Sequence, residues 1–236
     1  SLAELHAIKG YYRRPEVVER RREVGLPAAP TDVELEALAQ TWSEHCKHKI
    51  FNAIIRYKDD VEGTQRTIDS LFKSAIVAST RDIEERVDWL VSVFHDNAGV
   101  VRLDDELNLV FKVETHNSPS ALDPYGGSIT GIVGVNRDPF GTGMGAELLT
   151  NTWGYCLGSP FYGEALPEGL LHPRRIRDGV HQGVIDGGNQ SGVPYSRGFE
   201  LFDDRYIGKP LVFCGTVGLM PREVGGRPAE RKEVHP

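Results

Sequence analysis

The chain has 236 residues, of which 39% are hydrophobic and 26% charged, and its formal net charge is −7. This length supports one substantial core, or one domain with a smaller appendage. The acidic balance argues against a general nucleic-acid-binding surface, so no nucleic-acid partner is expected. The sequence contains no long apolar stretch and no signal-peptide core, which predicts a cytoplasmic protein without a membrane partner.

The cysteines are odd in number and widely separated: Cys46, Cys156 and Cys214. Since no two of them form a CxxC pair, neither a disulfide framework nor a cysteine-rich zinc site is predicted.

The chain begins with a basic region of helical character, residues 1–30. Residues 31–34 read Thr-Asp-Val-Glu, a capping-box sequence that predicts the start of a helix. Leu35, Leu38 and Trp42 follow at helical spacing, and we expect them to be buried.

Short strands and helices alternate through the middle of the chain. The patterns predict strands at 50–57, 91–94 and 100–103 and helices at 67–78 and 81–90. Because the spacing is not that of regular βαβ units, the alternation favours an α+β fold over a doubly wound sheet.

A chemically rich strand follows at residues 107–113, where β-branched and aromatic residues predict extended structure. Side chains alternate in a strand, so Lys112, Glu114 and His116 should share one face. A lysine, a carboxylate and a histidine together suit a site for phosphate and magnesium. A solvated edge strand with mixed charges is the alternative.

Two glycine-rich zones come next. Residues 123–127 are predicted to form a loop that leads into an apolar segment, 128–135, ending at Arg137 and Asp138. Residues 183–198 are also predicted to be a loop, between a helical approach at 174–184 and an exit strand at 209–219. The glycines of this second zone serve close packing more often than ligand binding.

Several motifs resemble, in the same order, the synthetase part of the phosphoribosylformylglycinamidine synthase family. The similar stretches are residues 30–35, 41–53, 114–120, 124–127, 137–138, 188–194 and 208–212. The resemblance therefore runs from about Thr31 to Leu219.

The resemblance implies an ATP- and magnesium-dependent ligase of purine biosynthesis. Members convert formylglycinamide ribonucleotide and ammonia to formylglycinamidine ribonucleotide, and a glutaminase subunit or domain supplies the ammonia. The implied fold is the N-terminal domain of an aminoimidazole-ribonucleotide-synthetase-like unit, whose mixed, largely antiparallel sheet is packed by helices. Pairing as a homodimer through the sheet is also implied.

The resemblance divides the chain into a helical linker segment, residues 1–60, and a synthetase N-terminal domain, residues 61–236. A C-terminal α/β domain normally follows in the family, and we expect it to be absent from this chain. The fragment on its own is therefore expected to lack part of the catalytic machinery.

Site residues are implied where motifs match position by position. The matching residues are His45 and His116 as catalytic groups, Lys112 and His48 as ATP contacts, Glu114 and Asp138 as magnesium ligands, and Thr115, Asn117, Ser118 and Arg137 as substrate contacts. His116 matches the proton acceptor. Ser118 departs from the family, since many members have histidine there. His48 stands where shorter members have tyrosine.

Three alternatives stay open. One is another ATP-dependent enzyme of the same superfamily, and another is a nucleotide-binding or dimerisation module without independent catalysis. The third, a zinc site built from His45, Cys46, His48 and His116, is disfavoured because neighbouring helix residues point about 100° apart.

Overall fold

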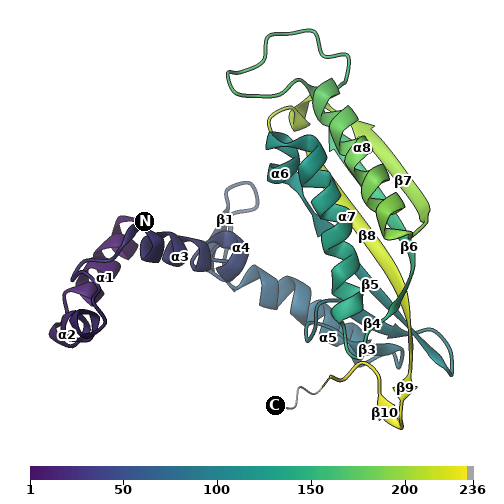
Figure 1. The fold of residues 1–236 in the computed structure, drawn as a ribbon, viewed down its shortest axis with the longest axis horizontal. Coiled ribbons are helices and arrows are strands. Elements are labelled where there is room, and N and C mark those ends of the chain that lie inside the picture. The colour runs from purple at the N-terminus through teal and green to yellow at the C-terminus, as the bar shows by residue number, and fades with distance from the viewer. Residues whose placement is uncertain (233–236) are drawn as a thin grey trace. The chain divides into compact units, whose positions relative to one another are not determined.

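The chain divides into two compact units, Ser1–Arg86 and Val87–Pro236, of which the computed structural model describes residues 1–232 (Figure 1). The predicted division at residue 60 falls in the turn after a strand of the first unit and stays a prediction.

The first unit begins with four helices. They are α1 (Leu2–Tyr12), α2 (Pro15–Glu23), α3 (Asp32–Thr41) and α4 (Glu44–Lys47). The predicted capping box at the start of α3 is confirmed. The backbone N–H of Glu34 donates to Thr31 Oγ1 at 3.3 Å, and the backbone N–H of Thr31 donates to the Glu34 carboxylate at 2.8 Å.

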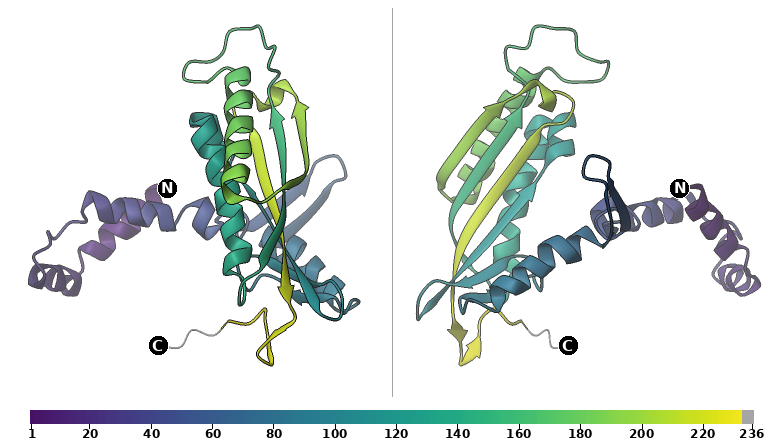
Figure 2. Two further views of the ribbon diagram at one scale, coloured as in Figure 1. Left: turned by 45° about the vertical axis from the view of Figure 1, so that its right-hand side comes forward. Right: turned by 180° about the vertical axis from the view of Figure 1, so that it is seen from behind.

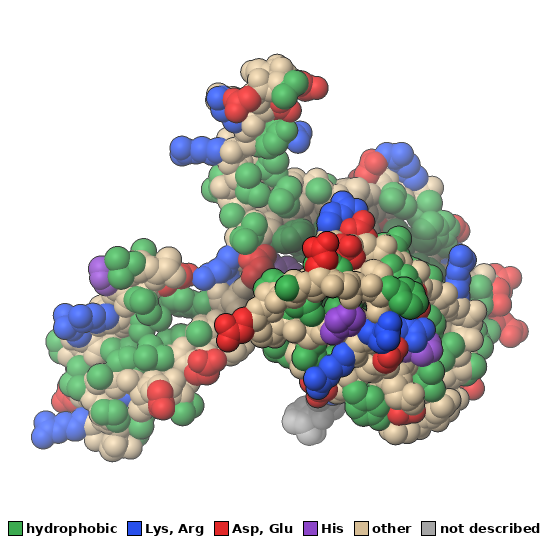
Figure 3. All heavy atoms as spheres, turned by 90° about the horizontal axis from the view of Figure 1, so that it is seen from above, with side chains coloured by type: hydrophobic (Ala, Val, Ile, Leu, Met, Phe, Trp, Pro, Cys, Tyr) green, Lys and Arg blue, Asp and Glu red, His purple; other side chains and the backbone are tan. Residues whose placement is uncertain are grey.

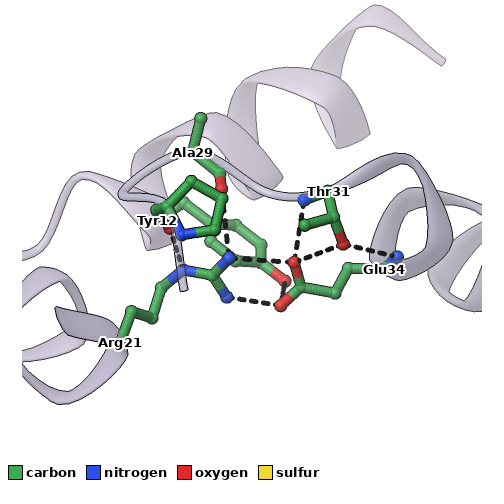
Figure 4. A network of polar contacts seen from close by, with 6 residues as sticks. Tyr12, Arg21, Ala29, Thr31 and Glu34 are labelled. Carbon is green, nitrogen blue, oxygen red and sulfur yellow. Dashed lines mark hydrogen bonds and ion pairs between the residues drawn. The ribbon is translucent and has the colours of Figure 1, made fainter. Parts of the chain in front are cut away.

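A buried arginine ties α2 to α3 (Figure 4). Arg21 makes a two-pronged ion pair with Glu34, one prong at 2.9 Å, and also donates to the carbonyl oxygens of Pro27 and Ala29 at 2.7 and 3.0 Å. Its guanidinium lies 4.8 Å from the centre of the Tyr12 ring. These contacts fix the proline-rich turn between the two helices.

The expected burial of the apolar face of α3 is wrong. Leu35 and Trp42 are 39% and 38% exposed, and Leu38 is half-buried. In this unit only Arg21 and Ser70 are buried. Short helices here cover one another only in part, because the unit has no broad sheet against which an apolar stripe could pack. Figure 3 shows the resulting hydrophobic side chains over the α1–α3 segment, at the left of the view.

A hairpin and a longer helix complete the first unit. They are β1 (Ile54–Asp59), β2 (Thr64–Asp69), a π-helical segment (Phe72–Val77) and α5 (Ala78–Glu84). The predicted helix at 67–78 is wrong in its first four residues. Gly63, with a φ of +67°, closes the hairpin turn, and residues 64–69 then pair antiparallel with β1. The predicted helix at 81–90 ends early, at Glu84.

The second unit is built on a six-stranded sheet. Its strands are β3 (Leu90–Ser92), β4 (Gly99–Arg102), β5 (Leu107–Thr115), β6 (Glu147–Leu157), β7 (Tyr195–Phe202) and β8 (Leu211–Pro221). Their order is β3-β4-β5-β8-β6-β7, and only β6 and β7 run parallel. The predicted α+β fold with a mixed, largely antiparallel sheet is therefore confirmed.

Helices cover one face of this sheet (Figure 2). They are α6 (Asn117–Leu122), α7 (Pro124–Gly141) and α8 (Pro173–Ser191); a short 3₁₀ turn (Asp204–Tyr206) and the strands β9 (Glu223–Val224) and β10 (Arg227–Pro228) lie outside the main layers. The core joins Ile132 and Val135 of α7 and Val180 of α8 to Tyr155 and Val212 of the sheet. None of the helices within residues 1–232 combines the length and apolar character needed to cross a bilayer.

Both glycine-rich zones were wrongly predicted as loops, since residues 124–127 and 183–191 are helical. Packing explains the glycines. A Cβ on Gly187 would lie 3.2 Å from Ile132, and one on Gly183 would overlap the Ser128 hydroxyl of α7. The interpretation of these glycines as packing residues is thus confirmed, whereas strand β7 was missed by the sequence patterns.

Candidate functional site

Strand β5 carries the predicted polar face. Val110 is buried in a core cluster with Val100 and Met220 of the neighbouring strands. Lys112 and Glu114 continue the same alternation. His116 follows the strand directly, and its backbone N–H donates to the carbonyl oxygen of Val212 at 2.8 Å. The prediction that the three polar side chains share one face is confirmed by their contacts with α7, described next.

Helix α7 supplies the opposite wall of the site. It begins at Pro124, and the Asp123 side chain accepts the backbone N–H of Gly126 at 3.3 Å. Arg137 and Asp138 lie three and four residues after Gly134, so all three face the same side of the helix. Lys112 Nζ is 3.1 Å from Asp138 Oδ2, and both side chains are about one-quarter exposed.

The imidazole of His116 is held by packing. A Cβ on Gly131 would lie 3.1 Å from His116 Cδ2 and 3.3 Å from Cys214 Sγ, so the ring fits against a bare stretch of helix. Burial raises the pKa of the Cys214 thiol to about 12, which keeps that neighbour neutral. His116 Nε2 is buried without a hydrogen-bond partner among the described residues, and it lies 3.8 Å from Glu114 Oε2.

Gly134 marks the point where the polar groups meet. A Cβ on this residue would lie 3.9 Å from each of three atoms: Arg137 Nη2, Glu114 Oε2 and His116 Cε1. With the Lys112–Asp138 pair, five predicted site residues therefore gather where β5 faces α7.

The donor set suits a magnesium ion that arrives with a phosphate group. In the part of the chain that the structure describes, no cluster of three or more His, Cys, Asp or Glu side chains could hold a metal by itself. Magnesium, however, commonly uses one or two protein carboxylates together with substrate phosphates and waters. Glu114 and Asp138 match that pattern, with Lys112 as a point charge for phosphate.

The remaining motif residues lie at the margins. Thr115 is exposed, and strand alternation places it on the opposite sheet face from Glu114. Asn117 Oδ1 accepts the backbone N–H of Val212 at 2.8 Å, so its carbonyl anchors the start of α6 to β8. Ser118 is exposed in the first turn of α6.

His45 and His48 belong to the first unit. His45 lies in α4, and His48 caps that helix in a left-handed conformation with a φ of 52°. The His48 ring stands edge-on to the rings of Phe51 and Phe72, with centroids 6.5 and 6.2 Å away. Glu44 supports the loop by accepting the backbone N–H of Ile50 at 2.7 Å.

Sequence reasoning missed the small residues that shape the site. Gly127, Gly131 and Gly134 recur at helical spacing and form the surface against which α6 and His116 lie. Their spacing of four and three residues was the available signal for a helix with a bare face. Nothing in the sequence marked Cys214 as a residue that, like His116, lies against Gly131.

A family model described as "AIR synthase related protein, N-terminal domain" matches residues 95–220, more than half of the chain. The chain belongs to this family. The AIR-synthase-like fold implied by the motifs is thereby confirmed. A second model, "Formylglycinamide ribonucleotide amidotransferase linker domain", matches residues 1–49.

Curated relatives of this family member are phosphoribosylformylglycinamidine synthase subunits PurL. The chain is 35% identical to that of Thermoplasma acidophilum over 94% of its own length and 24% of the relative. It is 33% identical to that of Salinibacter ruber over 89% of itself and 23% of the relative. The chain thus spans about a quarter of the length of these relatives, and the resemblance seen in its motifs is confirmed.

Solved structures lead to the same group. PurL of Thermotoga maritima complexed with ADP superposes with a TM-score of 0.52 and 27% identity, over 85% of this chain and 26% of that one. PurL from the same organism complexed with FGAR gives a TM-score of 0.52 and 28% identity, over 85% and 25% of the two chains.

Proposed function

We propose that this chain forms part of a cytoplasmic, ATP- and magnesium-dependent ligase that makes formylglycinamidine ribonucleotide in purine biosynthesis. The observation that carries the proposal is the meeting of Lys112, Glu114, His116, Arg137 and Asp138 between β5 and α7. Relatives of the same family were solved with ATP and with FGAR, which supports a nucleotide and this substrate as ligands.

Each side chain then has a role that its chemistry suits. Lys112 contacts the ATP phosphates, while Glu114 and Asp138 hold magnesium, which when bound neutralises phosphate charge. Arg137 offers a planar fork for a phosphate or amide oxygen of the substrate. ATP activates the substrate by transfer of its γ-phosphoryl group to the amide oxygen. Ammonia then attacks the amide carbon, the bond from carbon to that oxygen breaks, and phosphate leaves. His116 accepts a proton from the attacking ammonia, because a neutral imidazole is a competent base near pH 7.

The other predicted contacts complete the proposal. Thr115, Asn117 and Ser118 contact the substrate from the segment that joins β5 to α6. From the first unit, His45 takes part in catalysis and His48 contacts ATP. Residues 1–60 and 61–236 act as the linker segment and the synthetase domain.

We also propose two partners. A glutaminase subunit or domain supplies ammonia, which the match of residues 1–49 to an amidotransferase linker domain supports.

A second copy of the chain pairs through the sheet face that carries no helix of this unit within the described residues. Four large apolar side chains on that face are each 44–48% exposed: Phe111, Val113, Phe199 and Leu201. An exposed apolar patch of this kind is typical of a protein–protein interface. Analytical sedimentation of the wild type and of a Phe199→Lys variant tests the pairing. A dimeric wild type and a monomeric variant would support it, and a monomeric wild type would exclude it.

Calorimetric titration with a non-hydrolysable ATP analogue, with and without magnesium, tests the site. We expect binding that requires magnesium, is lost in Lys112→Ala, and needs more magnesium in Glu114→Gln and Asp138→Asn. The control is Lys58→Ala, which removes an exposed lysine whose ion pair with Asp60 lies in the β1–β2 hairpin. An unchanged magnesium titration in both carboxylate variants would refute their role as ligands.

The second candidate function is a nucleotide-binding module without turnover of its own. It is favoured by the correspondence of these residues to about a quarter of the length of the relatives, since a site to which other parts of such a protein contribute is less preorganised in this part alone. Formation of the amidine from ATP, formylglycinamide ribonucleotide and ammonia by this chain alone would exclude it.

A further inference from the structure

Three buried polar side chains lie directly behind the candidate site. Asn151 Nδ2 donates to Asn136 Oδ1 and to Thr216 Oγ1, both at 2.7 Å, and lies 3.2 Å from the carbonyl oxygen of Gly215. Asn136, Asn151 and Thr216 are each at most 4% exposed. No part of the proposed chemistry uses them.

Two of these residues, Thr216 and Asn151, share a row of the sheet with the proposed phosphate lysine. Lys112 of β5 pairs with Thr216 of β8, and Thr216 pairs with Asn151 of β6. Helix α7 touches both ends of this row. Asp138 contacts Lys112 at one end, and Asn136 contacts Asn151 at the other. A single turn of α7 is thus fixed at two points, by one ion pair and one neutral hydrogen bond.

The two contacts differ in what a ligand would do to them. In the proposed function, on which this inference rests, Lys112 turns to phosphate and Asp138 to magnesium, so their ion pair opens. The Asn136–Asn151 hydrogen bond is buried and neutral, and nothing in the ligand competes for it. It would then be the contact that keeps this turn of α7 in place while the site is occupied.

Stability alone accounts poorly for the two amides. Asn136 Nδ2 and Asn151 Oδ1 are buried without a hydrogen-bond partner among residues 1–232. A half-satisfied buried network contributes less to stability than an apolar pair of similar shape. Polar pairs in such positions are better explained by the unique geometry that they impose.

We propose that Asn136 is a positioning residue, which together with Asn151 fixes the Arg137–Asp138 turn of α7 over the strand that carries Lys112. The pair acts as an amide latch, defined here as the Asn136 Oδ1 to Asn151 Nδ2 hydrogen bond. It touches neither nucleotide nor substrate and acts only through the turn that it holds.

A double-mutant cycle separates positioning from stability. Asn151→Leu leaves the Asn136 amide without its partner, and Asn136→Leu removes one of the acceptors of the Asn151 amide, so both should lower the melting temperature. The double leucine variant removes both amides and should recover part of that loss. Its affinity for a magnesium–ATP analogue should nevertheless stay about tenfold below wild type, the usual order for residues that orient ligand-holding groups.

Asn108→Leu is the matched control. Asn108 is a 2% exposed amide on the helix-facing side of β5, and its Oδ1 also lacks a partner within the described residues. It is not part of the latch, so its replacement should leave analogue affinity unchanged. A double leucine variant with wild-type affinity would overturn the proposal, because the latch would then serve stability alone.

Hydrogen exchange at the backbone amides of residues 136–138, 140 and 141 gives a readout that needs no ligand. These amides should exchange faster in the double leucine variant than in wild type or Asn108→Leu. If wild type fails to bind the analogue but exchange quickens as expected, the proposed nucleotide site fails and the latch remains. Unchanged exchange would overturn the latch whether or not the analogue binds.

Discussion

Different interactions stabilise the interior of each of the two compact units. In the second unit, helices α7 and α8 bury an apolar core against the sheet, with Val135, Val180 and Val212 fully enclosed. In the first unit the buried side chains are polar, Arg21 and Ser70, while large apolar side chains stay exposed. One unit is stabilised by packing, the other by a few directed polar contacts.

This difference determines which of the proposed catalytic side chains are held rigidly. His116 packs against α7 at Gly131, where Cys214 also lies, and this close packing leaves its ring little freedom. His45 and His48, in the first unit, are exposed side chains on a short helix and its cap. A preorganised proton acceptor therefore belongs to the packed unit, because packed side chains hold their geometry best.

The largest expected effect comes from removing the packed histidine. His116→Ala should lower synthetase activity of the complete enzyme by about 10²–10⁴-fold, the usual contribution of a general base. The fold should survive, since the β5–β8 ladder and the core do not depend on the imidazole. Steady-state turnover and a melting curve measure both. Near-normal turnover would remove the proton-acceptor role.

The same glycine-to-alanine change should have opposite signs in the two units. Gly131→Ala places a methyl 3.1 Å from the His116 ring and 3.3 Å from Cys214 Sγ. We expect a stability loss of roughly 1–3 kcal/mol from overpacking and turnover lowered by about 10²-fold through misplacement of His116. Gly10→Ala, in α1 with open space around it, should instead stabilise by roughly 0.5–1 kcal/mol.

Circular dichroism melts and turnover assays of both variants check this contrast. If the two variants changed the melting temperature by the same amount in the same direction, both units would tolerate an added methyl group equally well.

A smaller effect should follow from loosening the polar unit. Arg21→Gln removes the two-pronged ion pair with Glu34 and the bonds to the turn before α3. Limited proteolysis within residues 24–31 should accelerate, while the second unit stays protected. Arg20→Gln removes a neighbouring exposed arginine and should change nothing. Equal protection in the two variants would show that the ion pair does not hold the turn.

The smallest effect is a pH dependence confined to the first unit. Arg21, followed by the backbone N–H and hydroxyl of Thr31, holds the pKa of Glu34 well below its usual range. Such a carboxylate contributes stability that is complete above its unfolded pKa, about 4.3, and is lost as pH falls toward the folded pKa. Amide NMR signals of Thr31 and Glu34 should therefore change below about pH 4.

In Glu34→Gln this acid-induced change should vanish, whereas Glu36→Gln, an exposed neighbour on α3, should retain it. A change that persists in Glu34→Gln would assign the acid sensitivity to another group.

Sequence patterns predicted best where local chemistry and tertiary packing agree. The capping box of α3 and the polar face of β5 were both correct, because each depends on residues a few positions apart. The fold class followed from the alternation of elements, and the family from ordered motifs. Five of the predicted site residues proved to be neighbours.

Patterns failed where distant packing decides. The glycines at 126–127 and 183–188 were predicted to lie in loops, yet they are helical. Where α7 and α8 pack against each other, a Cβ at Gly183 or Gly187 would meet the facing helix. The sequence predicts that the apolar face of α3 is buried, but the first unit offers no surface broad enough to bury it. The latch between Asn136 and Asn151 joins a helix to a strand and has no local signature.

The pairing of β5 with β8 has a consequence for how the protein is made. Strand β5, at 107–115, gains its long antiparallel neighbour only when residues 211–221 have been synthesised. Until then the growing chain carries Lys112 and Glu114 on a strand with one free edge, and such edges invite pairing with other chains. Completion of β8 closes that edge and completes the row from Lys112 to Asn151, so the proposed site appears late in synthesis and in a single step.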